Sequence, residues 1–497
     1  MTTLTLKDLL ADEAPGNGAA APVTGVTADS RAVAKGSLFF ALKGEKTDGM
    51  AYAEAAARAG AAAIVTDSPA APASIGDVPV VCVANARRTL ALAASRFHPR
   101  QPGTIAAVTG TSGKTSVAAF VRQIFAFDGH PSASIGTVGV VRPSGKVYGG
   151  LTTPDPVTLH QTLDTLAGEG VTHVAFEASS HGLDQHRLDG VRIQAAGFTN
   201  LSRDHLDYHK TFEAYRTAKL RLFTDLLPPD GTAVVVAGPE GDHFAAAARA
   251  RGQRLLMVGR DRAFGETGIA ILSETIKGAS QRVKLRAFGR DSEVLIPLLG
   301  RFQVENALVA AGLAVGCGTD PDKALAALET LEGAKGRLEF VGAKDGAPVV
   351  VDYAHKPGAL ETVLEAARPF AARKLVVVVG CGGDRDPGKR PMMGRIAVDK
   401  ADRVIITDDN PRSEDPAAIR AQVLADAPGA EEIGDRAEAI RAAVRDLQPG
   451  DLLVIAGKGH ETGQIVGSVT LPFSDHEVAL AAIRDFSSDR SAKGPSA

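Results

Sequence analysis

A short glycine-rich segment has the residue types and the spacing of a loop that binds phosphate groups. Its residues are Gly110, Thr111, Ser112, Gly113, Lys114 and Thr115. They follow a β-branched run, Ile105 to Thr109, and precede a stretch with helical spacing, Ser116 to Phe127. In such a strand-loop-helix unit, backbone N–H groups and the helix N-terminus face the phosphate oxygens, a lysine reaches the outer phosphates, and a threonine hydroxyl can ligate Mg²⁺. The sequence therefore predicts a nucleoside triphosphate site, with an ordinary glycine turn as the alternative.

This loop is a shortened variant, because Val108 stands where the full pattern has glycine. Its metal needs a carboxylate at the end of a neighbouring strand, and Glu177 follows the apolar run from Val171 to Phe176. We therefore expect Glu177 to bind Mg²⁺, although a glutamate at a strand end is more often a solvated charge. His205 is a second candidate for the metal or a phosphate, with a structural role as its alternative.

Short β-branched runs alternate with alanine-rich helical stretches along the whole chain, which predicts an α/β protein with parallel sheets covered on both faces. The predicted strand runs are 61–66, 105–109, 171–176, 233–237, 349–351, 375–379, 404–407 and 452–456. Proline and glycine interrupt the pattern at 98–103, and a glycine-containing segment does so at 331–336. We therefore expect three domains, over residues 1–100, 101–335 and 336–497.

The composition restricts the classes of partner. The 497 residues carry a net charge of −3, which gives no electrostatic reason to expect nucleic acid or an anionic membrane as a partner. The three cysteines contain no CxxC pair, and the N-terminus does not read as a signal peptide. The apolar runs are of strand length, far below the roughly 20 residues of a membrane span. We expect a soluble, cytoplasmic monomer that acts on small molecules.

Several further motifs occur in one order along the chain. They are Glu177 to Gly182, Asn200 to Asp207, Asp352 to His355, and Ala456 to Glu461. Together with the glycine-rich loop, they resemble the motifs of the Mur ligases over nearly the whole chain. The resemblance implies an N-terminal domain for the UDP end of the substrate, a central ATPase domain, and a C-terminal Rossmann-like domain for the incoming amino acid. The implied activity is ATP-dependent amide bond formation in peptidoglycan precursor synthesis, through an acyl phosphate.

The resemblance also implies which residues bind the UDP-linked N-acetylmuramoyl dipeptide. They are Ala28 and Ser30 on the uridine side, and Thr152, Thr153, Ser179, Gln185 and Arg187 on the pyrophosphate and peptide side. Hydroxyl, amide and guanidinium donors suit an anionic ligand, although each alone would be an unremarkable surface residue. Leu151 departs from the pattern, because relatives often have asparagine there.

For the nucleotide, the resemblance adds Ser116, Asn306, Arg337 and Asp352 to the glycine-rich loop, and implies that ATP is held by two domains. It implies that Lys114, Lys219 and His205 act in catalysis. Lys219 matches a lysine that is carbamylated in the family, and its carbamate would join Thr115 and Glu177 as a metal ligand. Without the resemblance, Lys219 would read as a lysine on a helix surface. Gln303 and Lys356 replace residues that are more usual in the family.

A last signature concerns the amino acid. Asp409, Asn410, Pro411 and Arg412 form the family's signature for meso-diaminopimelate, and Arg385, Gly457 and Glu461 match the other positions that bind it. The planar guanidinium group of Arg412 suits the carboxylate that distinguishes diaminopimelate from lysine. The alternatives are an Asn-Pro turn with a surface arginine, a sister ligase for lysine or a D-alanyl dipeptide, a folylpolyglutamate synthase, and a nucleotide-binding regulator without catalysis.

Overall fold

The computed structural model describes residues 4–14, 18–44, 47–147 and 151–492. The chain forms two compact units, one of residues 1–258 with 309–321, and one of residues 259–308 with 322–497. Both contain parallel sheets covered by helices, so the predicted α/β class is confirmed. None of the helices in the described ranges combines the length and the apolar character that a bilayer span requires.

The first unit begins with a five-stranded sheet in the order β1-β2-β3-β5-β4. Its strands are β1 (Gly25–Thr27), β2 (Ser37–Phe40), β3 (Ala63–Thr66), β4 (Ser74–Ile75) and β5 (Val78–Cys82). Side chains alternate along β2, so Leu38 and Phe40 pack on helices α1 (Leu6–Leu10) and α3 (Ala86–Phe97), while Phe39 packs on α2 (Ala53–Arg58). The sheet therefore has helices on both faces.

A second sheet in this unit has β6 near its middle, in the order β13-β12-β11-β6-β10-β7-β8-β9. Its strands are β6 (Thr104–Thr109), β7 (Ser132–Gly136), β8 (Gly139–Arg142), β9 (Gly145–Val147), β10 (His173–Glu177), β11 (Ala195–Phe198), β12 (Thr232–Val236) and β13 (Arg254–Gly259). In this order, the strands from β13 through β12, β11, β6 and β10 to β7 are parallel to one another. Strand β8 is antiparallel to β7, and β9 is antiparallel to β8. The carboxyl ends of β6, β10 and β11 therefore meet at one edge, where α/β sheets bind ligands.

The helices of the first unit connect these strands. They are α4 (Lys114–Phe127), α5 (Pro156–Gly168), α6 (Ser180–Asp184), α7 (Leu206–His209), α8 (Phe212–Arg221) and α9 (Pro239–Ala250). Helix α5 begins at a typical N-cap. Asp155 accepts hydrogen bonds from Val157 N and Thr158 N, and Pro156 occupies the first turn.

The second unit contains an antiparallel meander and a six-stranded sheet. The meander is β14 (Ile269–Lys277), β15 (Ser280–Ala287) and β16 (Arg290–Ile296), with helices α10 (Phe264–Thr267) and α12 (Pro321–Ala327) in the same part of the chain. Helix α11 (Arg301–Gly316) spans the junction between the two units. The six-stranded sheet has the order β17-β18-β22-β19-β20-β21 and is parallel except for β17.

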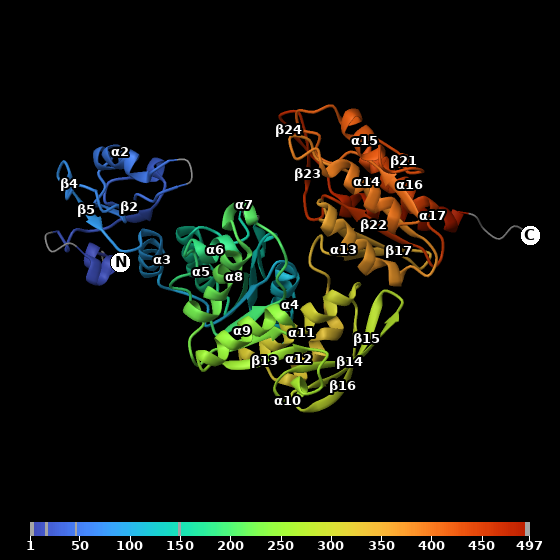
Figure 1. Ribbon diagram of the computed structural model, residues 1–497, viewed down its shortest axis with the longest axis horizontal. Coiled ribbons are helices and arrows are strands. Elements are labelled where there is room, and N and C mark those ends of the chain that lie inside the picture. Colours follow the sequence, from blue (N-terminus) through green and yellow to red (C-terminus); the bar gives the residue numbers. More distant parts are fainter. Residues whose placement is uncertain (1–3, 15–17, 45–46, 148–150, 493–497) are drawn as a thin grey trace, which may run out of the picture. The chain divides into compact units, whose positions relative to one another are not determined.

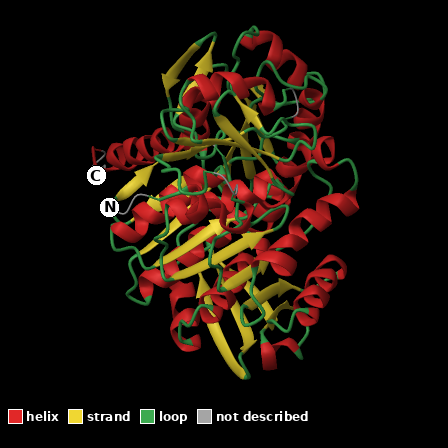
Figure 2. Ribbon diagram, turned by 90° about the vertical axis from the view of Figure 1, so that its left-hand side faces the viewer, coloured by secondary structure: helices red, strands yellow, loops and turns green. Residues whose placement is uncertain are grey.

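The strands of this sheet are β17 (Glu339–Lys344), β18 (Ala347–Asp352), β19 (Leu375–Val379), β20 (Arg403–Ile406), β21 (Glu431–Glu432) and β22 (Leu452–Ala456). Helices α13 (Pro357–Ala367), α14 (Lys389–Lys400) and α15 (Pro416–Leu424) cover one face, and α16 (Arg436–Asp446) and α17 (Asp475–Ala492) cover the other. Figure 2 shows the same elements by type, with the strands in yellow and the helices in red. A hairpin of β23 (Gly463–Val466) and β24 (Val469–Pro472) follows β22.

Each strand run expected from the sequence coincides with a strand whose ends differ by at most two residues, and the runs 375–379 and 452–456 have the same ends as β19 and β22. The expected boundaries at 98–103 and 331–336 lie in connections, between α3 and β6 and before β17. The division into three domains stays a prediction.

Candidate active site

The glycine-rich loop lies between β6 and α4, at the carboxyl edge of the parallel sheet. Gly110 and Gly113 have φ angles of +149° and +90°, which favour glycine. A Cβ atom at Gly110 would lie 2.0 Å from Thr199 Oγ1, so the close approach of the segment after β11 also requires glycine. Asn200 fixes the loop, because its carbonyl accepts from Thr111 N at 2.9 Å and its side-chain oxygen accepts from Ser112 N at 3.0 Å.

Two lysines meet at this loop. Lys114 Nζ donates to the carbonyl oxygens of Gly110 and Thr111, at 2.8 and 3.0 Å. Lys219 Nζ, on α8, donates to the same Gly110 oxygen at 2.7 Å and lies 4.6 Å from the centre of the Tyr215 ring. Lys219 is only 1% exposed, which excludes the alternative of a lysine on a helix surface.

The environment of Lys219 favours the neutral amine. Burial lowers the pKa of Lys219 well below its usual value, and the positive charge of Lys114 lowers it further, whereas Asp204 opposes the shift. A neutral amine is the form that reacts with CO₂, so Lys219 meets the chemical requirement for the expected carbamate.

Glu177, the last residue of β10, is 2% exposed and therefore is not a solvated charge. Its carboxylate accepts from Thr115 Oγ1 at 3.0 Å, Thr137 N at 2.7 Å and Thr137 Oγ1 at 3.2 Å. The structure thus brings Thr115 and Glu177 together as expected. Their oxygen atoms are of the type that Mg²⁺ prefers, so these residues fit the metal.

A cluster of rings lies beside the loop. His205 has a φ of 53° at the start of α7, and its ring centre lies 4.8 Å from that of His181 and 6.3 Å from that of Tyr215. Burial lowers the pKa of His181, and the neighbouring His205 and His209 lower it further. His181 and His209 are not among the residues expected from the sequence, although His181 lies in the motif from Glu177 to Gly182 and His209 follows the motif from Asn200 to Asp207. The catalytic role of His205 stays a prediction.

A cavity of about 880 Å³ lies in the first unit, where the N-terminal segment faces the sequence around α5 and α6. Its lining includes four residues expected to bind the UDP-linked substrate, namely Ala28, Ser30, Gln185 and Arg187. Arg187 donates to Thr153 O and to Gln185 Oε1, both at 2.7 Å.

The other expected substrate residues connect this cavity to Glu177. Thr153 Oγ1 donates to Glu177 O at 2.7 Å and accepts from Ser179 N at 3.0 Å. The hydroxyls of Thr152 and Thr137 are 3.0 Å apart, and Thr137 binds the Glu177 carboxylate. One hydrogen-bonded chain therefore leads from the candidate substrate cavity to the candidate metal ligand.

The remaining nucleotide candidates lie together in the second unit. Asn306 Nδ2 donates to Gln303 Oε1 at 3.0 Å, and Gln303 Nε2 donates to Arg337 O at 2.9 Å. Asp352 accepts from the backbone N–H groups of Leu338 and Ala354, while its burial raises the pKa of the carboxyl group. Because the glycine-rich loop belongs to the first unit, a nucleotide grip by both units stays a prediction.

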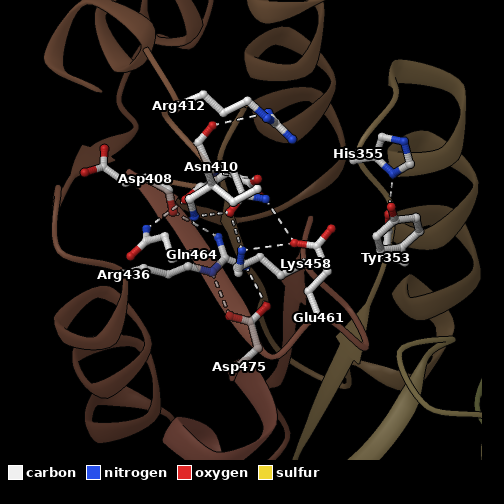
Figure 3. A network of polar contacts seen from close by, with 12 residues as sticks. Tyr353, His355, Asp408, Asn410, Arg412, Arg436, Lys458, Glu461, Gln464 and Asp475 are labelled. Atoms are coloured by element: carbon white, nitrogen blue, oxygen red, sulfur yellow. Dashed lines mark hydrogen bonds and ion pairs between the residues drawn. The ribbon is translucent and has the colours of Figure 1, made fainter. Parts of the chain in front are cut away.

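The candidate amino-acid site follows the carboxyl ends of β19, β20 and β22. Figure 3 shows polar side chains of this site. Asn410 is 4% exposed, and its Nδ2 atom donates to Glu461 Oε2 at 3.0 Å. Gly457 has a φ of +119°, and a Cβ atom there would lie 2.7 Å from Asp409 Oδ2. Four expected residues from distant segments are thus brought together at one edge of the sheet.

Arg412 is held by its backbone and its side chain. It has a φ of 52°, its N–H donates to Ile465 O at 3.0 Å, and its Nη1 atom donates to Gly383 O at 2.9 Å. Gly383 approaches Pro411 so closely that a Cβ atom would lie 1.9 Å from Pro411 O. Arg385, on the same loop as Gly383, is exposed and forms no hydrogen bond or ion pair with another described residue. The guanidinium group of Arg412 is therefore held in place by hydrogen bonds, unlike that of a free surface arginine.

Comparisons with known proteins agree with this arrangement. Models of the Mur ligase family match the chain in three places, as the catalytic domain over residues 22–98, the middle domain over 108–314 and the glutamate ligase domain over 336–459. The UDP-N-acetylmuramoyl-L-alanyl-D-glutamate–2,6-diaminopimelate ligase of Bradyrhizobium diazoefficiens is 61% identical over 97% of this chain and 99% of its own length. The protein of the same name from Agrobacterium fabrum is 56% identical over 97% of this chain and 96% of its own length.

Solved structures give the same result. A structure of a UDP-N-acetylmuramoyl-L-alanyl-D-glutamate–2,6-diaminopimelate ligase matches with a TM-score of 0.73 and 34% identity, over 99% of this chain and all of that one. A MurF structure from Acinetobacter baumannii shares the fold, with a TM-score of 0.59 and 18% identity over 98% of both chains. The chain belongs to the Mur ligase family.

Proposed function

We propose that this chain is the ATP-dependent ligase that joins meso-2,6-diaminopimelate to the D-glutamate residue of UDP-N-acetylmuramoyl-L-alanyl-D-glutamate, in the synthesis of peptidoglycan precursors. The observation that carries the proposal is the segment from Asp409 to Arg412, in which Asn410 is bonded to Glu461 and Arg412 is fixed against Gly383. Relatives at 55–61% identity carry the corresponding name.

The reaction needs no covalent bond to the enzyme. The γ-carboxylate of D-glutamate attacks the γ-phosphorus of ATP, so that a P–O bond to ADP breaks and an acyl phosphate forms. The amine of diaminopimelate then attacks the acyl carbon, loses a proton, and expels phosphate. The protein positions these groups and offsets their charge. The loop N–H groups and Lys114 act on the phosphates, and Ser116 lies on the first turn of α4 beside them.

We assign Mg²⁺ to Thr115 and Glu177. When bound there, the cation would neutralise phosphate charge. Lys219 would add a carbamate oxygen, formed when its neutral amine takes up CO₂ and releases a proton. The buried position of Lys219 beside the Gly110 carbonyl supports this assignment.

The arginine in the amino-acid site gives a reason for selectivity. Diaminopimelate differs from lysine by a carboxylate on its far carbon, and the guanidinium group of Arg412 can bind a carboxylate through paired hydrogen bonds. Lysine would leave this group without an anionic partner, which disfavours its binding.

We further propose that the enzyme works in the cytoplasm as a monomer on small-molecule substrates, and thereby supports cell-wall growth, cell shape and cell division. The three cysteines are all unpaired, which fits a reducing compartment. The net charge of −3 does not favour nucleic acid as a partner.

A substrate-pairing assay tests the proposal. Phosphate release from ATP is measured with the UDP-linked dipeptide, alone and with meso-diaminopimelate, lysine or D-alanyl-D-alanine. Release that depends on diaminopimelate is expected. Release with lysine or D-alanyl-D-alanine instead would assign the chain to a sister activity, and ATP binding without release in any mixture would favour a regulator.

The variant Arg412→Ala refines this test. We expect kcat/KM for diaminopimelate to fall by about 100-fold or more, because a charged hydrogen-bonded pair is lost, while the KM for ATP stays within about twofold. Arg412→Gly is the matched variant, because it removes the same side chain and relieves the left-handed φ angle. Equal losses for ATP and diaminopimelate in both variants would overturn the assignment of Arg412.

A further inference from the structure

Lys458 is a fully buried lysine that none of the steps above uses. It follows β22 in the segment from Gly457 to Glu461, and its side chain has an exposed fraction of 0%. Its ammonium group donates to Asn410 Oδ1 at 2.9 Å and to Glu461 Oε2 at 3.1 Å (Figure 3). Because a buried ammonium group is costly unless it is paired, its presence between these two side chains calls for an explanation.

The first consequence of this lysine is a fixed orientation of the Asn410 amide. Asn410 Oδ1 accepts from Lys458 Nζ and also from Ile465 N, at 2.9 Å. A flipped amide would point its NH₂ group at two donors, so only one orientation is compatible with the network. The Nδ2 atom therefore faces Glu461 Oε2, and its second N–H remains for a ligand carboxylate.

The second consequence concerns charge. Two carboxylates border this site, those of Asp409 and Glu461, and Asp409 Oδ2 has no hydrogen-bond partner among the described residues. Arg436 binds Asp475 through its Nε and Nη2 atoms, both at 2.7 Å, so its charge acts on Asp409 and Glu461 without a direct ion pair to either. Lys458 binds Glu461 Oε2 and leaves Oε1 available, so Glu461 can accept an ammonium group without repelling a neighbouring carboxylate at full strength.

We propose that Lys458 is a positioning residue for the amino-acid substrate, which holds Asn410 and Glu461 in their binding orientation and balances the charge of Glu461 against the far carboxylate of diaminopimelate. The inference rests on the proposed function, since it concerns the same site. This role explains why Lys458 is buried in the site although Arg412 already supplies a positive charge for the ligand carboxylate.

The test replaces Lys458 by methionine, which keeps most of the volume and removes the charge. We expect the KM for meso-diaminopimelate to rise about 10- to 50-fold, the scale of one charge interaction across roughly 7–12 Å at an effective dielectric constant near 20. The KM values for ATP and the UDP-linked dipeptide should stay within about twofold, because we assign neither substrate to these side chains.

A second readout separates positioning from a loss of structure. Lysine has the far ammonium group but lacks the far carboxylate, so Lys458→Met should weaken its binding only through the lost orientation of Glu461 and not through the lost charge balance. The ratio of kcat/KM for diaminopimelate to that for lysine should therefore fall about 10-fold or more in Lys458→Met. A purely structural lysine would lower both values in parallel, and that result would overturn the proposal.

Lys344→Met is the matched control. Lys344 is another buried lysine of the same unit, and its ammonium group donates to the carbonyls of Arg445 and Leu447 rather than to a substrate-binding side chain. We expect this variant to lose stability but to keep its KM for diaminopimelate. A rise in that KM equal to the rise in Lys458→Met would contradict the proposal.

If Lys458→Met does not fold, a pair of variants gives the same information. Glu461→Gln keeps the hydrogen bond from Lys458 to Asn410. The double variant Glu461→Gln with Lys458→Met removes both members of the ion pair, of which Lys458 is buried and Glu461 is 32% exposed, and folded proteins tolerate this better than the loss of one member. The double variant should have a KM for diaminopimelate about 5-fold or more above that of Glu461→Gln alone. Equal KM values would overturn the inference.

The activity of the wild-type protein shows whether a negative result contradicts the proposed function or only the role of Lys458. If wild-type protein does not use diaminopimelate, the proposed function is wrong. If it uses diaminopimelate and the Lys458 variants have unchanged KM values, the proposed function stands and the role of Lys458 is wrong.

Discussion

The ammonium group of Lys219 and the carbonyl oxygen of Gly110 are joined by a hydrogen bond of 2.7 Å, so a buried lysine is attached to the first residue of the phosphate-binding loop. The pKa of this lysine is lowered by burial and by the nearby charge of Lys114. Because the unfolded chain holds a proton at this lysine that the folded chain disfavours, the lysine lowers stability below its usual pKa, which is the expected cost of a functional group held in the interior.

Lys219→Met should therefore inactivate the enzyme and stabilise it. We expect kcat to fall by about 100-fold or more, because a metal ligand is lost, and the melting temperature to rise by about 2 °C or more. A short carboxylic acid should restore part of the activity of Lys219→Ala, since it can supply the missing oxygen ligand. Full activity of either variant without added acid would contradict the carbamate.

The same lysine predicts a dependence of stability on pH. The unfolded chain binds a proton at Lys219 up to about pH 10.4, whereas the folded chain loses this proton at a lower pH. Wild-type stability should therefore rise with pH between the two pKa values, and the advantage of Lys219→Met should shrink over the same window. Melting temperatures of both proteins from pH 6 to about pH 10 in CO₂-depleted buffer measure this difference. An advantage that is constant with pH would show that Lys219 stays protonated in the folded chain.

Two glycines with positive φ angles provide a test of the loop. A Cβ atom at Gly110 would lie 2.0 Å from Thr199 Oγ1, whereas one at Gly129, with a φ of +88°, would meet nothing within 4 Å. Gly129→Ala should cost only the backbone strain of about 1 kcal/mol. Gly110→Ala should in addition displace the loop and lower kcat/KM for ATP by about 100-fold, because small displacements at a reacting group have large effects. Equal ATP kinetics in the two variants would argue against phosphate binding at Gly110.

The contact between Thr115 and Glu177 predicts a specific effect on the metal requirement. Glu177→Gln keeps the shape of the side chain, and the hydroxyls of Thr115 and Thr137 can accept hydrogen bonds as well as donate them, so the fold should persist. We expect the Mg²⁺ concentration for half-maximal phosphate release to rise at least about 10-fold. Glu169→Gln, whose partner is Arg142 in the same unit, is the control and should leave the Mg²⁺ dependence unchanged.

The loop and its carboxylate could be predicted from the sequence because they depend on local patterns. Strand β10 pairs in parallel with β6, with Glu177 opposite Val108, so two strand ends followed by polar residues necessarily lie side by side. The segment from Asp409 to Arg412 likewise follows the strand run expected at 404–407, which is β20 in the structure. The resemblance to the Mur ligases supplied the remaining residue roles.

Other features could not be predicted because they depend on strand order. Strand β22 lies between β18 and β19 although it is the last strand of its sheet in the sequence, and only this insertion brings Lys458 to Asn410. The burial of Lys219 was not predicted either, because α8 mixes apolar residues with charged ones and its sequence alone does not show which side faces the core. Conversely, Arg385 was expected in the amino-acid site, and the structure places it on the right loop but leaves its side chain exposed.

The ion pair between Arg436 and Asp475 gives a final prediction, on the rigidity of the amino-acid site. Both side chains have an exposed fraction of 0%, and Arg436 also donates to Ala456 O at 3.0 Å, next to Gly457. Asp475→Asn leaves a buried guanidinium group without its anion and should lower the free energy of unfolding by about 3–5 kcal/mol.

The matched control is Asp399→Asn, which breaks an ion pair between Arg395 and Asp399 whose side chains are 60% and 55% exposed. This change should cost less than about 1 kcal/mol, because water already screens the pair. The protein contains no tryptophan, so hydrogen exchange of peptides from β22 and α16 is a suitable measurement. Asp475→Asn should accelerate exchange in both elements and raise the KM for diaminopimelate, since the carbonyl before Gly457 loses its fixed partner. Similar exchange rates in the two variants would mean that the ion pair does not hold this edge of the sheet.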